Sequence, residues 1–159
     1  MVGAGCQTPT PVPAYPPLAV VPSSAPEAAA APAEFTLTVV GTNDVHGHFE
    51  RLDAFAGHLA VLRRLRASSG AVVLLDAGDM WQGTLPSNLD EGQSMVRAYG
   101  ALGYDAAAIG NHEFDYGPIG ERATPGGPDD DPRGALFARV AEASFPMPAA
   151  HFSDNATGA

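Results

Sequence analysis

The sequence predicts an α/β protein built on a parallel sheet, because short apolar segments alternate with segments of helical periodicity from residue 35 onward. Residues 35–40 are β-branched and apolar, residues 53–67 carry apolar side chains at helical spacing, and residues 71–75 are apolar again. A strand, a helix and a second strand in this order are typical of a βαβ unit, in which the two strands run parallel.

The first three elements have distinct patterns. The strand over residues 35–40 ends at a polar loop that begins at Gly41. Along the helix over residues 53–67, four side chains share one face that we expect to pack on the sheet: Phe55, Leu59, Leu62 and Arg66. The apolar run over residues 71–75 does not alternate with polar residues, which predicts a strand buried on both faces.

The later elements follow the same alternation. We expect a helix, a strand, a helix and a strand, in that order, over residues 91–102, 105–109, 134–143 and 145–150. Gly103 ends the first of these helices, since glycine readily adopts the left-handed conformation that closes a helix. The segment over residues 116–133 is rich in Gly, Pro and Asp, which predicts a solvated surface loop.

The N-terminal segment differs in composition from the rest. Residues 7–33 contain eight Pro and eight Ala among 27 residues, without apolar periodicity, so we expect a disordered tether. Small residues precede Cys6, as at the end of a bacterial lipoprotein signal, although no charged and apolar leader precedes them. We therefore expect residues 1–34 to be a signal remnant and tether, with a candidate lipid anchor at Cys6 and an extracytoplasmic location. The alternative is a cysteine without special function in an extension.

Composition excludes several classes of protein. The net charge is −10, and all eight basic residues are arginine, so the chain lacks the basic face that binding to a nucleic-acid polymer requires. No apolar run approaches the roughly 20 residues that span a bilayer. A single cysteine allows neither an internal disulfide nor a cysteine-built zinc site.

Polar clusters follow each of the first three predicted strands, at residues 44–46, 78–79 and 110–113. The carboxyl ends of parallel strands share one edge of the sheet, so these clusters are expected to meet. Asp44 and His46 are two residues apart, and in extended backbone their side chains would leave the same face. A carboxylate beside an imidazole suits a first-row divalent metal. Asp79 can bridge two ions, and Asn111 can supply a neutral carbonyl oxygen.

Three longer stretches contain these clusters: TNDVHGH at residues 42–48, DAGDMWQGT at residues 76–84 and IGNHEFDYG at residues 109–117. In order and approximate spacing they resemble the calcineurin-like metallophosphoesterase superfamily, and within it the 5′-nucleotidase branch. The resemblance runs from about residue 36 to residue 158. It implies a layered α/β/β/α metallophosphoesterase sandwich, incomplete in this chain, with residues 35–159 as the N-terminal portion of that domain.

The resemblance further implies two divalent metal ions as cofactors, zinc, manganese or similar. Asp44 and His46 would hold the first ion. Asp79 would bridge both ions, and Asn111 would hold the second. Two such ions hold the attacking and leaving oxygens in line at phosphorus and make hydroxide available at neutral pH.

The catalytic residues implied by the resemblance lie in the third stretch. His112 would be the catalytic histidine beside the phosphate, and Asn111 would also contact the substrate. Asp115 would orient His112 and favour its charged form. Glu113 is expected to orient its neighbours without binding metal, and Trp81 to lie in the core.

The implied function is hydrolysis of a phosphate monoester of a small-molecule nucleotide. The family completes its metal site with later histidines, two of them in a Gly-His-x-His pattern, and recognises nucleosides with a C-terminal domain. After His112 this chain has only His151, so we expect the C-terminal half of the enzyme to be missing from it. Two alternatives stay open: a truncated, catalytically inert metal-binding module, or the same chemistry on cyclic nucleotides or nucleotide sugars.

An incomplete sandwich would expose the sheet face that the second sheet covers. A large exposed apolar patch favours association between molecules. We therefore expect this chain alone to dimerise or to be poorly soluble.

Overall fold

The computed structural model describes residues 34–150, in which three parallel strands form one sheet. The strands lie in the order β1–β2–β3 and span Thr36–Thr42, Gly70–Asp76 and Ala106–Ala107. The predicted α/β class and parallel topology are confirmed. The predictions for the tether, Cys6 and His151 lie outside the described residues.

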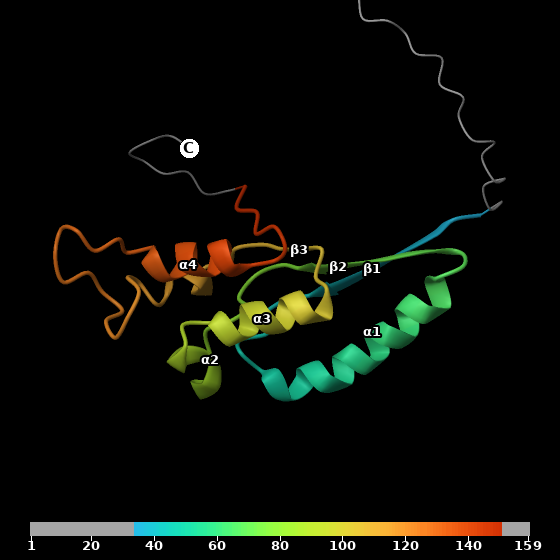
Figure 1. The fold of residues 1–159 in the computed structure, drawn as a ribbon, viewed down its shortest axis with the longest axis horizontal. Coiled ribbons are helices and arrows are strands. Elements are labelled where there is room, and N and C mark those ends of the chain that lie inside the picture. Colours follow the sequence, from blue (N-terminus) through green and yellow to red (C-terminus); the bar gives the residue numbers. More distant parts are fainter. Residues whose placement is uncertain (1–33, 151–159) are drawn as a thin grey trace, which may run out of the picture. The chain divides into compact units, whose positions relative to one another are not determined.

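Four α-helices and two short 3-10 helices connect the strands in the described part of the chain. The α-helices are α1 (Leu52–Arg66), α2 (Leu85–Leu89), α3 (Gln93–Leu102) and α4 (Gly134–Glu142), and the 3-10 helices are η1 (Phe49–Arg51) and η2 (His112–Phe114). Figure 1 shows α1 and α3 on the same side of β1 and β2. The sequence predicted α1, α3 and α4 to within two residues at each end, but it did not predict α2, which has only five residues. None of the helices in residues 34–150 has both the length and the apolar character needed to cross a membrane.

Helix α1 packs on the sheet through the predicted stripe. Leu59 is buried, and the other members of the stripe are half-buried. Arg63, one helical turn after Leu59, donates hydrogen bonds to the carbonyl oxygens of Leu102 and Gly103 at 2.7 and 2.8 Å. Gly103 adopts φ +70° and ends α3 as predicted. Arg63 therefore ties α1 to the C-terminal end of α3.

The opposite face of the sheet is uncovered in the described residues. Leu37 and Val39 are 56% and 61% exposed on β1, and Leu75 is 38% exposed on β2. The parallel register pairs Val39 with Val73 and Gly41 with Leu75, so these side chains share one face. The prediction that residues 71–75 are buried on both faces is therefore wrong, because helices cover only one side of these strands. The predicted exposed apolar face is confirmed.

The third and fourth predicted strands are shorter than expected. β3 has two residues, and no strand is assigned over residues 145–150. That segment still lies beside β3, because the N–H of Ala107 donates to Pro146 O and the N–H of Ile109 donates to Pro148 O, both at 3.1 Å. Proline has no N–H to return to the neighbouring strand, so the pairing is one-sided and a regular ladder does not form.

The core lies between the covered face of the sheet and the helices. Its buried members are Leu59, Leu74, Met80, Trp81, Met95, Val96, Tyr99, Tyr104, Ala107, Leu136 and Phe145. Trp81 is fully buried, which confirms the prediction that it is a core residue. Trp81 follows closely after Asp79. Its packing therefore anchors the loop that carries Asp79, a candidate metal ligand.

A buried carboxylate joins the ends of β1 and β2 beneath that loop. Asp76 accepts hydrogen bonds from the hydroxyls of Thr42 and Tyr99, at 2.5 and 3.0 Å. Its other oxygen accepts the N–H of Gly78 at 2.8 Å. The ring of Tyr104 stacks on Tyr99 with centroids 4.0 Å apart. Burial raises the pKa of Asp76 even though three donors surround it.

Replacing Asp76 with alanine is expected to lower the free energy of unfolding by about 2–3 kcal/mol, because buried donors lose their acceptor. D76N keeps one acceptor oxygen and removes the ionisable group. The folded state raises the pKa of Asp76 above its unfolded value near 4, so its contribution to stability is largest below that pH and declines as pH rises through the folded pKa. Urea denaturation should show the stability of the wild type falling relative to D76N above about pH 4. A difference that does not change with pH would contradict this account.

Candidate metal centre and active site

The loops after β1 and β2 carry three candidate residues in left-handed backbone. Asp44, His46 and Asp79 have φ values of 52°, 50° and 60°. The expectation that Asp44 and His46 share a face because the backbone is extended is therefore wrong. The two loops pair beyond the strands, since the N–H of His46 donates to Asp79 O at 3.0 Å and the N–H of Gly47 donates to Met80 O at 2.8 Å. Left-handed non-glycine residues are uncommon and concentrate at functional sites.

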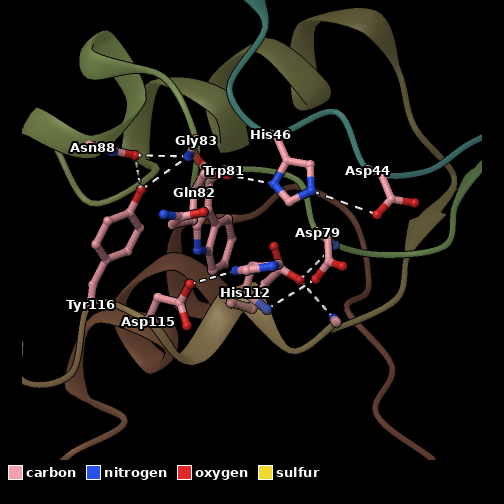
Figure 2. A network of polar contacts seen from close by, with 12 residues as sticks. Asp44, His46, Asp79, Trp81, Gln82, Gly83, Asn88, His112, Asp115 and Tyr116 are labelled. Atoms are coloured by element: carbon pink, nitrogen blue, oxygen red, sulfur yellow. Dashed lines mark hydrogen bonds and ion pairs between the residues drawn. The ribbon is translucent and has the colours of Figure 1, made fainter.

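These loops converge with the segment after β3. One ligand atom from each of His46, Asp79 and His112 lies within 4.8 Å of the other two. Asp44 borders this cluster, with its Oδ1 3.6 Å from His46 Nε2 (Figure 2). The rings of His46 and His112 meet edge to face, with centroids 5.0 Å apart. The three strand ends therefore meet at one edge, as predicted.

Each histidine of the cluster is oriented through its Nδ1 atom. His46 Nδ1 lies 2.6 Å from Gln82 O, and His112 Nδ1 lies 2.6 Å from Asp115 Oδ2. A carbonyl oxygen can only accept, so His46 carries its proton on Nδ1 and its Nε2 is left with a lone pair. Histidines that bind metal are commonly held in this way by a carbonyl or carboxylate on the other nitrogen. With the carboxylates of Asp79 and Asp44 nearby, this donor set fits a divalent ion.

Asn111 lies next to the cluster on the same turn as His112. It is exposed and immediately precedes η2. The backbone N–H of His112 donates to Asp79 Oδ1 at 3.0 Å, which links this turn to the loop after β2. The structure thus brings together four of the predicted site residues, Asp44, His46, Asp79 and His112, and Asn111 directly precedes His112 on the same turn.

Glu113 orients the loops, as predicted. Its carboxylate is 1% exposed and accepts three backbone N–H groups: those of Asp79, Met80 and Gly110, at 2.9, 2.7 and 2.7 Å. Burial raises the pKa of Glu113, while these three donors act in the opposite direction. A single buried side chain therefore joins the loop after β2 to the loop after β3.

Sequence reasoning missed a second layer of contacts around His46. Gln82 acts only through its backbone carbonyl, which no side-chain pattern reveals. Asn88 Oδ1 accepts hydrogen bonds from the N–H of Gly83 and from the hydroxyl of Tyr116, at 3.1 and 2.9 Å. Asn88 lies on α2, an element that the sequence did not predict, whereas Tyr116 was already within the third quoted stretch.

The electrostatic surroundings of His112 favour its protonated form. The hydrogen bond that His112 donates to the Asp115 carboxylate raises the pKa of His112, and the negative charges of Asp115, Asp79 and Glu113 add to that shift. D115N keeps the shape of this partner and removes its charge, so the pKa of His112 is expected to fall towards its ordinary value. NMR titration of the His112 ring in metal-free protein measures this change. Equal midpoints in the wild type and D115N would show that the pairing does not set the protonation of His112.

Comparison with known proteins agrees with this geometry. The family model of the calcineurin-like phosphoesterases matches residues 37–151. A snake venom 5′-nucleotidase from Gloydius brevicauda is 41% identical over 99 residues, covering 54% of this chain and 17% of that protein. A 5′-nucleotidase from Vibrio cholerae is 33% identical over 132 residues, covering 78% of this chain and 21% of that protein.

A solved structure shares the fold. The Haemophilus influenzae NAD nucleotidase superposes with a TM-score of 0.59 at 21% identity, over 76% of this chain and 22% of that one. The chain thus spans about a fifth of the length of these relatives. With the strand-end cluster and a family match over residues 37–151, the chain belongs to the calcineurin-like phosphoesterase family.

Proposed function

We propose that this chain forms part of a metal-dependent hydrolase that cleaves a phosphate monoester of a nucleotide, as a 5′-nucleotidase does. The observation that carries the proposal is the convergence of His46, Asp79 and His112 within 4.8 Å at the carboxyl edge of the sheet. The names of the relatives, 5′-nucleotidases from a snake venom and from Vibrio cholerae, support a nucleotide as substrate.

Two divalent ions, zinc or manganese, are proposed as cofactors. Asp44 and His46 would hold one ion, Asn111 the other, and Asp79 both. A bound divalent ion supplies Lewis-acid chemistry, since it polarises a phosphoryl oxygen and lowers the pKa of water. The hydrogen bond from His46 Nδ1 to Gln82 O supports this assignment, because it leaves His46 Nε2 unprotonated and therefore able to bind metal.

His112 is proposed as the proton-carrying group of the site. Asp115 holds Nδ1, so a protonated His112 would present its Nε2–H to a phosphoryl oxygen or to the leaving oxygen. Asn111, on the same turn, would donate its amide to the substrate. The turn of Asn111 and His112 would therefore supply hydrogen-bond donors to the substrate beside the carboxylate of Asp79.

The test is phosphate release from 5′-AMP, from a 2′,3′-cyclic nucleotide and from a UDP-sugar, each with and without added Mn²⁺ or Zn²⁺. The proposal expects metal-dependent release that is fastest from 5′-AMP and is lost in H112A. Faster release from either other substrate would move the specificity to that class. If metal binds but no substrate turns over, this chain by itself is an inert metal-binding module.

We propose an extracytoplasmic location, with Cys6 as a lipid anchor. A relative found in venom supports export for this group of proteins. Mass spectrometry of the N-terminal peptide would show the added acyl mass on Cys6. Recovery of the unmodified Cys6 peptide from cells would contradict the anchor.

A further inference from the structure

We propose that Asn88 and Tyr116 are positioning residues that hold His46 in its metal-binding orientation, acting through the peptide bond between Gln82 and Gly83. The inference rests on the proposed function of His46 as a metal ligand. Asn88 and Tyr116 do not reach the reacting atoms in this arrangement; they set the direction of the carbonyl group that His46 contacts (Figure 2).

His46 and Asn88 contact opposite sides of one peptide unit, the one that joins Gln82 to Gly83. Its carbonyl, Gln82 O, accepts the proton of His46 Nδ1 at 2.6 Å, and its N–H, on Gly83, donates to Asn88 Oδ1 at 3.1 Å. The peptide bond is planar and trans, so its C=O and N–H point in opposite directions. A partner fixed on the N–H side therefore fixes the direction of the carbonyl on the other side.

This peptide unit packs closely against His46. A Cβ atom placed on Gly83 would lie 2.5 Å from His46 O and 2.8 Å from His46 Cβ. Thr84 donates to Gly47 O at 2.6 Å, which fixes the residue after Gly83 to the loop after β1. The peptide unit therefore has little room to shift sideways, and rotation about its own axis is the motion that Asn88 restrains.

The hydrogen-bond partners of Asn88 fix the orientation of its side-chain amide. Both groups that meet its side-chain oxygen are donors, the N–H of Gly83 and the hydroxyl of Tyr116. An amide nitrogen in that place would face the N–H of Gly83, which can only donate, so the chemistry requires the oxygen there. This requirement predicts that aspartate, which also offers an acceptor oxygen, can replace Asn88.

Tyr116 connects the segments that support the two histidines. Tyr116 follows directly after Asp115, whose carboxylate holds His112 Nδ1 at 2.6 Å. Because the hydroxyl of Tyr116 donates to Asn88, the segment that orients His112 is joined to the peptide that orients His46. Asn88 Oδ1 is thus the point at which the two supporting segments meet.

The size of the expected effect follows from exposure. Asn88 and Gly83 are exposed, so water can replace a lost acceptor but cannot hold the peptide in one direction. Loss of a group that supports a metal ligand typically costs 10–100-fold in metal affinity. We expect the lower end, about 10-fold, for N88A.

The experiment compares N88A, N88D and Y116F with the wild-type chain, and L89A serves as the matched control because Leu89 is the exposed neighbour of Asn88 on α2. The first measurement is the tautomer of His46 in metal-free protein, from long-range ¹H–¹⁵N correlation spectra above the pH at which the ring titrates. The second is the dissociation constant for Mn²⁺ from calorimetry.

The wild type, N88D and L89A are expected to keep His46 protonated on Nδ1. All three are expected to bind Mn²⁺ with the same dissociation constant. N88A is expected to populate both tautomers of His46 and to bind Mn²⁺ about 10-fold more weakly. Y116F is expected to change the tautomer population and the Mn²⁺ affinity in the same direction, but by less. An unchanged tautomer and affinity in N88A would overturn the proposal, as would an N88D that behaves like N88A. If the wild type hydrolyses no phosphoester, the proposed function fails while the tautomer result still decides this inference.

Discussion

Replacing Asp79 with asparagine is expected to remove metal binding and phosphate release together. Asp79 is the carboxylate of the three-residue cluster, and its Oδ1 also accepts the N–H of His112 at 3.0 Å. Asparagine can keep that hydrogen bond while it loses the negative charge and one of the two acceptor oxygens. The expected loss of activity exceeds the 10–100-fold that is typical of groups which only support a ligand.

The measurement is thermal unfolding with and without Mn²⁺, alongside the phosphate assay. A ligand present at 100 times its dissociation constant stabilises the folded state by about 2.7 kcal/mol, and this gain should vanish in D79N. D129N is the matched control, because Asp129 is exposed in the acidic loop over residues 116–133. A D79N protein that loses stability but keeps its turnover would count against the proposed active site.

The second large effect is expected at Glu113. E113A would leave three backbone N–H groups of two loops without their acceptor, in a place that is 1% exposed. Donors bonded to a charged group contribute about 1.5–3 kcal/mol each, so the free energy of unfolding should fall by about 3 kcal/mol or more. E113Q keeps one acceptor oxygen, although its amide nitrogen then faces a backbone donor. The free energy of unfolding should therefore fall by less in E113Q than in E113A.

Urea denaturation measures this effect, and calorimetry with Mn²⁺ follows its consequence for the site. E121Q is the matched control, since Glu121 is exposed. Because Glu113 holds the loop of Asp79, weaker metal binding should accompany the loss of stability in E113A. Equal denaturation midpoints for E113A and the wild type would show that these hydrogen bonds do not join the loops.

The regular elements could be predicted because their sequence patterns are long. α1 shows its stripe over about three helical turns, and Gly103 marks the end of α3. The failures have local causes. β3 and its neighbour are apolar enough to be strands, but Pro146 and Pro148 cannot return hydrogen bonds. Helix α2 is shorter than two turns, which is below the length at which periodicity can be recognised.

Part of the site could also be predicted from the sequence, namely which residues meet. Parallel topology alone places the three clusters at one edge, so His46, Asp79 and His112 were expected to meet. The left-handed backbone of Asp44 and His46 could not be foreseen, since both residue types occur in many conformations. The contact from His46 to Gln82 O depends on a backbone carbonyl, and every residue has one.

The uncovered sheet face limits how the chain behaves in solution. Leu37 and Val39 stand on that face of β1, with Val73 and Leu75 beside them on β2. This apolar surface lies on the opposite side of the sheet from the helices, whereas the candidate ligands lie at its edge. Changes to this face are therefore expected to alter association more than metal binding.

The most direct test of the account is the position of metal in crystals grown with Mn²⁺, located by anomalous diffraction. Two peaks are expected, both within bonding distance of Asp79, one shared with Asp44 and His46 and the other with Asn111. Crystals of D79N grown in the same way should show neither peak. Manganese bound elsewhere, with no peak at Asp79, would contradict the central claim that the three strand ends form a metal-dependent active site.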